Sequence, residues 1–259
     1  VRCKGCSNAC LLTVNDFGKD ANGRNRRFIT GNRCEKGAGT HDETKNVPNL
    51  FEYKASRTFD YYHPLEESEA TRGVVGIPRA LNMYENYPFW FTFFTKLGYR
   101  VILSDPSTKK TYEAGIESMP SESVCYPAKL SHGHIMNLLV KRPDFIWMPC
   151  SKWERQEDEG AGNHFNCPIV ASYPEALRLN IDDLKDSETA FVSPWLPYDQ
   201  KDHLKIRLYH EMAENFADAM LAKGGPITQA EIDAAVEAAW AEDEEFKHDI
   251  RQKGVETLA

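Results

Sequence analysis

Short apolar runs alternate with amphipathic stretches between residues 73 and 192, and this alternation predicts an α/β domain. Five apolar runs are expected as strands, at 74–77, 99–103, 144–148, 168–171 and 190–192. Helices are expected at 88–97, where aromatic and leucine side chains recur every three or four residues, and at 127–140. Because a strand–helix–strand unit of this length permits a right-handed crossover, we expect a Rossmann-like parallel sheet.

A helical segment is predicted after the sheet, from His203 onward. Its apolar positions fall on one helical face, the Gly-Gly-Pro sequence at 224–226 interrupts it, and Thr228 with Glu231 matches the capping box of a last helix. The residues of the common face are Leu204, Leu208, Met212 and Phe216.

The residues before the α/β domain have a different composition. Four cysteines lie within the first 34 residues, and 35–72 is polar, with few periodic apolar positions and the turn former Pro48. We therefore expect three parts: a four-cysteine metal knuckle with its tether over 1–65, the α/β domain over 66–200, and a helical segment over 201–259.

The four N-terminal cysteines have the spacing of metal ligands. A Cys-x-x-Cys pair lets two thiolates converge on one ion, a third cysteine follows one helical turn later, and a distant fourth completes a tetrahedral shell. Zinc and an iron–sulfur cluster both accept four thiolates. We favour structural zinc, because this polar segment has too few apolar residues to form a core without the folding energy of a metal. The ligands would be Cys3, Cys6, Cys10 and Cys34.

Overall composition restricts the classes of function. The chain has 41% hydrophobic and 27% charged residues, as ordinary globular proteins do, and no window approaches the roughly 20 apolar residues of a membrane span. A net charge of −8 disfavours nonspecific binding to nucleic acid. An odd number of cysteines and no secretory leader favour a cytoplasmic location, and the start at Val1 indicates a fragment of a longer polypeptide.

The other three cysteines lie in the α/β domain, and two of them are expected at one edge of the sheet. Cys125 directly precedes a predicted helix, where free N–H groups stabilise a thiolate, and Lys129 lies one turn further on. Cys150 follows a predicted strand, and sites in open α/β sheets form beyond the carboxyl ends of strands. Cys167 precedes the predicted strand at 168–171, so we expect it at the opposite edge. The alternative for all three is a buried free cysteine.

Four stretches of the sequence carry a family resemblance. Residues 76–88 (GIPRALNMYENYP) and 121–134 (SESVCYPAKLSHGH) closely resemble the activase-related family of 2-hydroxyacyl-CoA dehydratases. Residues 3–10 (CKGCSNAC) and 31–35 (GNRCE) are similar to the segment that precedes this module in the same large anaerobic proteins. The resemblance covers about residues 1–175.

This resemblance implies a redox context. In the family, ATP-dependent activase domains of the acetate-kinase and Hsp70 type are joined to this module and to a part similar to the dehydratase subunits, which hold a four-iron four-sulfur cluster. Cys125 and Cys150 are similar to the first two cluster cysteines, and a later domain supplies the third ligand, so the resemblance implies an incomplete site in this chain. A phosphate loop of the activase type is absent from the sequence, so we do not expect this chain alone to hydrolyse ATP.

The candidate cofactor-binding residues are therefore Cys125, Cys150, Cys167, Lys129 and Arg79. With Asn82, the two cationic residues could form an anion site for a phosphate of CoA or of a nucleotide; surface charge and capping are the simpler interpretation. His132 and His134 are two residues apart in a predicted helix and so face different sides, which excludes a chelating pair, although one could approach the cysteines.

Two functional hypotheses remain. The first is a module that binds an iron–sulfur cluster and passes single electrons in an ATP-dependent acyl-CoA dehydratase or reductase, with activase and dehydratase-like domains as partners and an acyl-CoA as ligand. The second is a non-catalytic, zinc-stabilised domain that docks the activase and dehydratase parts together.

Overall fold

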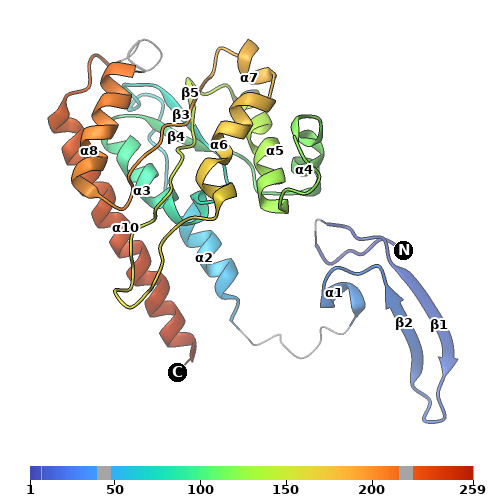
Figure 1. Cartoon of the computed structure of the whole chain (residues 1–259). Coiled ribbons are helices and arrows are strands. Elements are labelled where there is room, and N and C mark those ends of the chain that lie inside the picture. The colour runs from blue at the N-terminus through green and yellow to red at the C-terminus, as the bar shows by residue number, and fades with distance from the viewer. Residues whose placement is uncertain (7, 40–47, 216–223, 259) are drawn as a thin grey trace. The chain divides into compact units, whose positions relative to one another are not determined.

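The computed structural model describes residues 1–6, 8–39, 48–215 and 224–258 (Figure 1). The chain divides into two compact units, Val1–Asn49 and Leu50–Ala259. The first unit holds the N-terminal cysteines and the second holds the parallel sheet, so each is considered by itself.

The N-terminal unit contains a β-hairpin that the sequence analysis did not predict. Strands β1 (Thr13–Lys19) and β2 (Asn25–Thr30) pair antiparallel, and helix α1 (Glu35–Ala38) follows them. Asp20 closes the hairpin turn, because its Oδ1 accepts the backbone N–H groups of Asn22 and Arg24, both at 2.8 Å. A segment expected to contain only a knuckle and a tether therefore has backbone-paired structure of its own.

The second unit is built on a four-stranded parallel sheet with the order β4-β3-β5-β6. Its strands are β3 (Val74–Ile77), β4 (Arg100–Leu103), β5 (Phe145–Trp147) and β6 (Ala190–Val192). These are four of the five predicted strands, each within one residue of the expected bounds, and the predicted α/β fold with a parallel sheet is confirmed.

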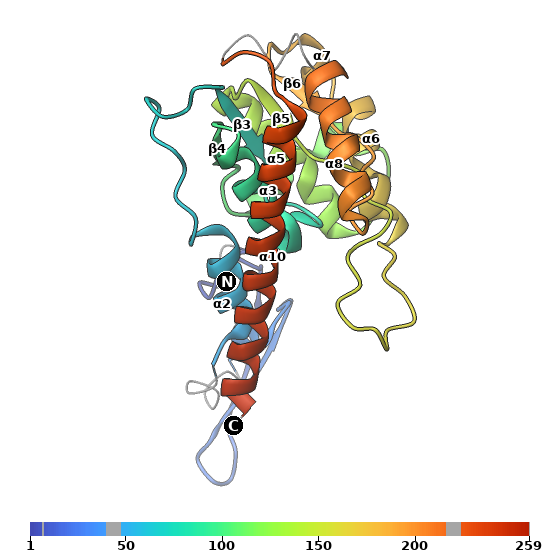
Figure 2. The same ribbon diagram turned by 90° about the vertical axis from the view of Figure 1, so that its left-hand side faces the viewer.

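Helices cover both faces of this sheet (Figures 1 and 2). Helices α3 (Met83–Lys96), α8 (Lys201–Tyr209) and α10 (Gln229–Leu258) pack on one face, and α5 (Tyr126–Lys141) and α6 (Pro168–Asn180) pack on the other. Strand β5 shows the alternation that two covered faces require: Phe145 and Trp147 belong to the first hydrophobic cluster, whereas Ile146 and Met148 belong to the second.

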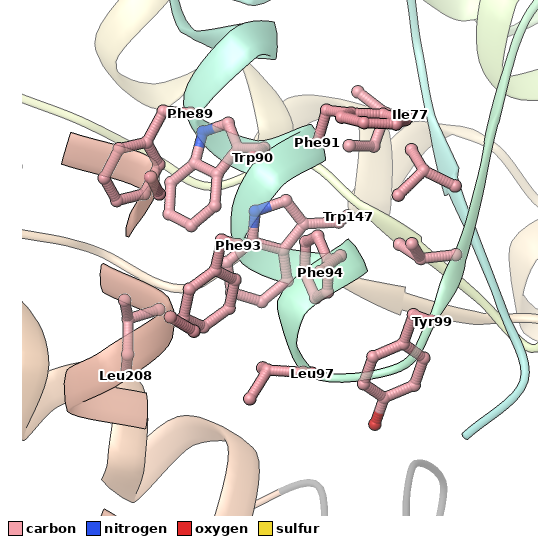
Figure 3. Close-up of a cluster of buried hydrophobic side chains, with 14 of the residues drawn as sticks. Ile77, Phe89, Trp90, Phe91, Phe93, Phe94, Leu97, Tyr99, Trp147 and Leu208 are labelled. Carbon is pink, nitrogen blue, oxygen red and sulfur yellow. The ribbon is translucent and has the colours of Figure 1, made fainter. Parts of the chain in front are cut away.

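Aromatic side chains of α3 form the centre of the larger core (Figure 3). The ring centroid of Trp147 lies 5.1 Å from that of Trp90 and 5.2 Å from that of Phe94, in edge-to-face arrangements. Helix α3 begins at Met83 and not at the predicted position 88, so Pro88 lies inside it. Gly98, with a φ of 87°, ends this helix as expected, because a left-handed residue is needed there.

Helix α2 (Leu50–Phe59) lies in the stretch that was expected to be a tether. Arg57 fixes it to α10: its guanidinium lies 2.8 Å from Asp249 and 3.2 Å from Glu242. Residues 50–65 and 201–259 therefore belong to one compact unit with the sheet, and the division at residue 49 differs from the predicted boundary at 65. Partners almost 200 positions away in the sequence hold α2, so local composition did not predict it.

The stretch 168–171, expected as a strand, is the first turn of α6. Pro168 suits this position, because the first helical residues need no N–H partner and a central strand does. Tyr173, Leu177 and Ile181 then recur every four residues and are buried in the second cluster. Four apolar residues in a row do not distinguish a strand from a buried helix, and the helical spacing that follows them was the missed signal.

The C-terminal segment is helical, as predicted. Leu204, Leu208 and Met212 are fully buried along one face of α8 and of the short helix η2 (His210–Asn215) that continues it. Phe216, the fourth member of that expected face, lies outside the described residues. The capping pair before α10 is confirmed: Glu231 N–H donates to Thr228 Oγ1 at 3.2 Å, and Thr228 N–H donates to Glu231 Oε2 at 2.8 Å.

Helix α4 (Lys109–Ala114) crosses α5 so closely that the contact requires a glycine. A Cβ on Gly133 would lie 1.7 Å from the carbonyl oxygen of Thr111, which is backbone and cannot rotate away. We expect Gly133→Ala to lower the free energy of unfolding by about 3 kcal/mol, since overpacking exceeds the gain in helix propensity. Urea unfolding followed by circular dichroism measures the change.

Gly162 is the matched control for this substitution, because no atom lies within 4 Å of an added Cβ. Gly162→Ala should leave the urea midpoint almost unchanged. Equal midpoints for the two alanine variants would contradict the close crossing of α4 and α5.

The remaining short elements are η1 (Ile116–Ser118) and α7 (Asp183–Asp186). Within the described residues, none of the helices has both the length and the apolar character needed to cross a bilayer.

Candidate functional site

The strand order creates a switch point between β3 and β5. The connection after β3 leads to β4 on one side, whereas the connection after β5 leads to β6 on the other. In open α/β sheets, ligands bind in the crevice that these diverging loops leave at the carboxyl ends of the strands. The loop after β3 also holds Leu81 at a φ of 49°, a left-handed conformation that is uncommon for leucine and often found near functional sites.

Three cysteines lie at this carboxyl edge. Cys125 is the N-cap residue of α5, Cys150 follows β5, and Cys167 is the N-cap residue of α6. The expectation that Cys167 lies at the opposite edge is wrong. Residues 168–171 begin helix α6 and not a strand, so Cys167 lies at the start of the helix, on the side of the sheet where β5 ends. The structure thus brings all three cysteines to one edge, two of them at helix N-termini.

These thiols have different environments. Cys125 and Cys167 are exposed, whereas Cys150 is fully buried. Burial, followed by the nearby negative charge of Glu175, raises the pKa of the Cys150 thiol to about 12, so it is protonated at neutral pH. Over the described part of the chain, no three His, Cys, Asp or Glu side chains are grouped in a way that could hold a metal ion.

An arm, residues 151–166, connects Cys150 to Cys167 and projects from the domain as the yellow loop in Figure 2. Its two sides pair antiparallel at Trp153 and Phe165, whose ring centroids are 3.4 Å apart. The chain therefore leaves the edge at one cysteine and returns to it at the next.

His132 is buried, and a chain of hydrogen bonds connects it to η1 and α6. Its Nδ1 lies 2.8 Å from Ser118 Oγ and its Nε2 lies 2.9 Å from Tyr173 Oη. The Ser118 hydroxyl already donates to the carbonyl of Gly115 at 3.1 Å, so it accepts from Nδ1–H, and Tyr173 O–H donates to Nε2. Burial lowers the pKa of His132 to about 4, which fits this neutral tautomer.

Tyr173 connects that chain of hydrogen bonds to the cysteine edge. Burial raises the pKa of its phenol, and Cys125 raises it further, which indicates that the two side chains are near each other. His132 is connected to this edge through Tyr173, and the approach of a histidine to the cysteines themselves stays a prediction.

His134 belongs to a second network. Its ring nitrogens lie 2.8 Å from Ser104 Oγ and 2.8 Å from Ser107 Oγ, and Ser104 Oγ also accepts the backbone N–H of Arg79. Burial, and then the charge of Arg79, lower the pKa of His134 to about 4. The two histidines thus face different partners, as the helical spacing indicated.

The cationic candidates are bonded to protein oxygens. Arg79 Nε donates to the carbonyl of Ser104 at 3.0 Å, and its guanidinium lies 3.8 Å from Asp60. Lys129 Nζ donates to the carbonyl of Glu122 at 2.6 Å. Asn82 is the N-cap residue of α3 and makes no side-chain cap bond. An anion near this edge would compete with these existing bonds.

A cavity of about 510 Å³ between α4 and α5 was not predicted. Its size is in the range of small-molecule sites, and its lining includes Asp105, which lies two residues after the end of β4. Hydrogen bonds from Lys141 and Asn137 hold the pKa of Asp105 below its usual value. An acidic residue two positions after a predicted strand was the signal that could have indicated this position. The apolar lining comes from Pro106, Ala114, Met136 and Val140.

The N-terminal cysteines lie in the other unit. Cys3 N–H donates to the carbonyl of Cys10 at 2.8 Å, and Cys3 Sγ accepts the N–H of Gly5 at 3.4 Å. Cys34 is the N-cap residue of α1, and Cys6 is exposed. The zinc site on these residues stays a prediction.

One family model matches the chain over residues 74–259, which include the whole sheet, the arm and the three edge cysteines. Its description is the CoA enzyme activase uncharacterised domain (DUF2229). No curated protein matches the chain, and no solved structure does. Since the matched range is well over half of the sequence, the chain belongs to the family of the CoA enzyme activase uncharacterised domain.

Proposed function

We propose that this chain is the electron-transfer module of an activase-related CoA enzyme and that Cys125, Cys150 and Cys167 bind an iron–sulfur cluster. The observation that carries the proposal is the position of these cysteines at one sheet edge, around the switch point where α/β folds bind ligands. Two of them are N-cap residues, at helix ends where the dipole favours a negatively charged ligand such as a thiolate-bound cluster.

The donor set fits a cluster in its chemistry, because iron–sulfur clusters are held by cysteine thiolates. The three thiols are not arranged as a metal-holding group here, so binding requires a rearrangement of the side chains around the buried Cys150 and of the exposed Cys125. When bound, a cluster would supply one-electron transfer. The polypeptide would bind and orient it and exclude water from the buried side.

The residues around the edge have supporting roles in this proposal. Tyr173 and His132 form a neutral hydrogen-bonded pair near Cys125 and add no charge to the site. Arg79 and Lys129 are the cationic groups that a phosphate of an acyl-CoA would recruit from their present carbonyl partners. Activase and dehydratase-like domains would be the protein partners and would carry out ATP hydrolysis.

Two observations favour a second candidate, a docking module. The thiol of Cys150 is fully buried and protonated, and the edge cysteines are not arranged as a metal-holding group in the described structure. In that case the edge cysteines are structural, and zinc bound by Cys3, Cys6, Cys10 and Cys34 stabilises the N-terminal unit.

Cysteine substitution tests the first candidate. Protein purified without oxygen and reconstituted with iron and sulfide should show the visible charge-transfer bands of a cluster. Cys125→Ser, Cys150→Ser and Cys167→Ser should each lower bound iron by at least about tenfold, because each removes a ligand. Elemental analysis and visible absorbance are the measurements.

Cys34→Ser is the matched control, since it removes a thiol from the other unit. It should lower the zinc content and leave the iron content unchanged. Wild-type protein without iron, or edge variants that retain all of it, would favour the docking module.

A further inference from the structure

Asn166 joins the two ends of the arm. Its backbone N–H donates to the carbonyl of Lys152 at 3.0 Å, and its side-chain Nδ2 donates to the carbonyl of Ser151 at 2.9 Å. Ser151 directly follows Cys150, and Asn166 directly precedes Cys167. The bonds of one asparagine therefore connect the backbone segments that carry two of the edge cysteines.

Glu154 holds the side chain of Asn166 in this orientation. Its Oε1 accepts from Asn166 Nδ2 at 2.7 Å, and its two carboxylate oxygens accept from Asn86 Nδ2 at 3.2 and 3.0 Å. Asn86 is 2% exposed on α3, so the base of the arm is bonded to a buried helix. Hydrogen bonds to an ionised carboxylate are about twice as strong as bonds between neutral groups.

We propose that Asn166 is a positioning residue that sets the separation of Cys150 and Cys167, with Glu154 and Asn86 as its anchor. The relevance to a cluster rests on the proposed function, whereas the link between the two segments does not. Only a side chain with two N–H donors can donate to the carbonyl of Ser151 and to the carboxylate of Glu154 at the same time. Because hydrogen bonding and geometry around the sulfurs set the potential of a cluster, this link would tune its reduction.

Asn166→Ala tests the link in the full chain. The variant should keep the wild-type far-ultraviolet circular dichroism, because the sheet and helices do not depend on this side chain. Its reconstituted cluster should show a shifted midpoint potential and an altered electron paramagnetic resonance spectrum. A purely structural role of Asn166 would lower the thermal midpoint and leave both cluster signatures unchanged, which would overturn the proposal.

Asn163→Ala is the matched control, since Asn163 lies in the same arm, is exposed, and bonds locally through its Oδ1 to the N–H of Phe165. It should retain the wild-type potential. Asn163→Ala and Asn166→Ala with equal shifts would show that any change in the arm has this effect and would overturn the specific role of Asn166.

Exchanging the two polar groups gives a second test. Asn166→Asp places a carboxylate against Glu154 and should disturb the site more than alanine does. Combining it with Glu154→Gln restores an amide–carboxylate bond at the anchor but leaves the carbonyl of Ser151 without its donor, so the potential should recover only in part. No recovery at all in the double variant would remove Glu154 from the proposal.

Hydrogen exchange of the metal-free protein separates failure of the link from failure of the proposed function. Across the arm, the N–H of Glu154 donates to the carbonyl of His164 at 2.9 Å and the N–H of Asn166 donates to the carbonyl of Lys152 at 3.0 Å. Asn166→Ala should speed the exchange of both amides by about tenfold. Unchanged exchange overturns the link whether or not iron binds. Faster exchange in a protein whose wild type binds no iron supports the link and rejects the cluster.

Discussion

The two buried histidines are expected to remove about 6 kcal/mol of stability as the pH falls from 6.5 to 4, before the offset from other groups, because both must take up protons. The pKa values of His132 and His134 are lowered from 6.5 to about 4, chiefly by burial. Each shift corresponds to roughly 3 kcal/mol. A histidine with a lowered pKa in the fold stabilises the folded state above pH 6.5, and this stabilisation is lost between pH 6.5 and 4.

Urea unfolding at pH steps from 7.5 to 4 measures this loss. Burial also raises the pKa values of Glu154 and Asp243; these carboxyl groups add stability as they become protonated and offset part of the decrease. His132→Gln should reduce the slope between pH 6.5 and 4 by about half. The comparison uses slopes, so a loss of stability common to all pH values cancels. A flat wild-type profile in this window would contradict the burial of neutral histidines.

Asp243→Ala is expected to lower the free energy of unfolding by about 3 kcal/mol, because it removes the buried carboxylate that two cations share and leaves them only the more exposed Glu244 and Glu157. Asp243 is fully buried on α10, and its Oδ2 lies 2.6 Å from Arg155 and 3.1 Å from Lys247. These two cations are 17% and 13% exposed, so water cannot replace the lost carboxylate well. Chemical denaturation at pH 7 gives the change.

The neighbouring residue provides a matched control. Glu244 pairs with the same Arg155 at 2.9 Å but is 61% exposed. Glu244→Ala should cost less than about 1 kcal/mol, because exposed ion pairs contribute little. Similar losses for the two variants would show that the buried pair has no special role and that helix propensity or net charge dominates.

The strands of the sheet could be predicted because each is a short, uninterrupted apolar run. Helices cover both faces of the sheet, so strand residues such as Val75 and Phe145 are buried and must be apolar. This requirement is visible in the local sequence as a continuous apolar run. The hairpin of β1 and β2 was missed although Asn22-Gly23 is a turn signal between two alternating stretches. Both strands are almost entirely exposed, so their period-two pattern of apolar residues is weak.

The candidate site was predictable in its residue types and only partly in its geometry. Spacing and helix signals located Cys125 and Cys150, but the position of Cys167 depended on whether 168–171 is helix or strand. The contacts of His132 and Asn166 could not be foreseen, because their partners Tyr173 and Glu154 are distant in the sequence and meet them only in the folded chain. Sequence patterns encode which face of an element is buried, whereas hydrogen-bond partners depend on how elements meet.

Helix α10 has a consequence for the order in which the polypeptide is made. Trp240 of α10 lies against Phe89 and Tyr198, each at a ring-centroid distance of 6.4 Å, and α10 packs along α3. During translation, α3 leaves the ribosome about 140 residues before α10. In the interval α10 does not yet cover the aromatic face of α3. The nascent chain must stay incompletely folded, or be bound by chaperones, until residues 229–258 have been synthesised. Folding of the unit is then completed late and in one step.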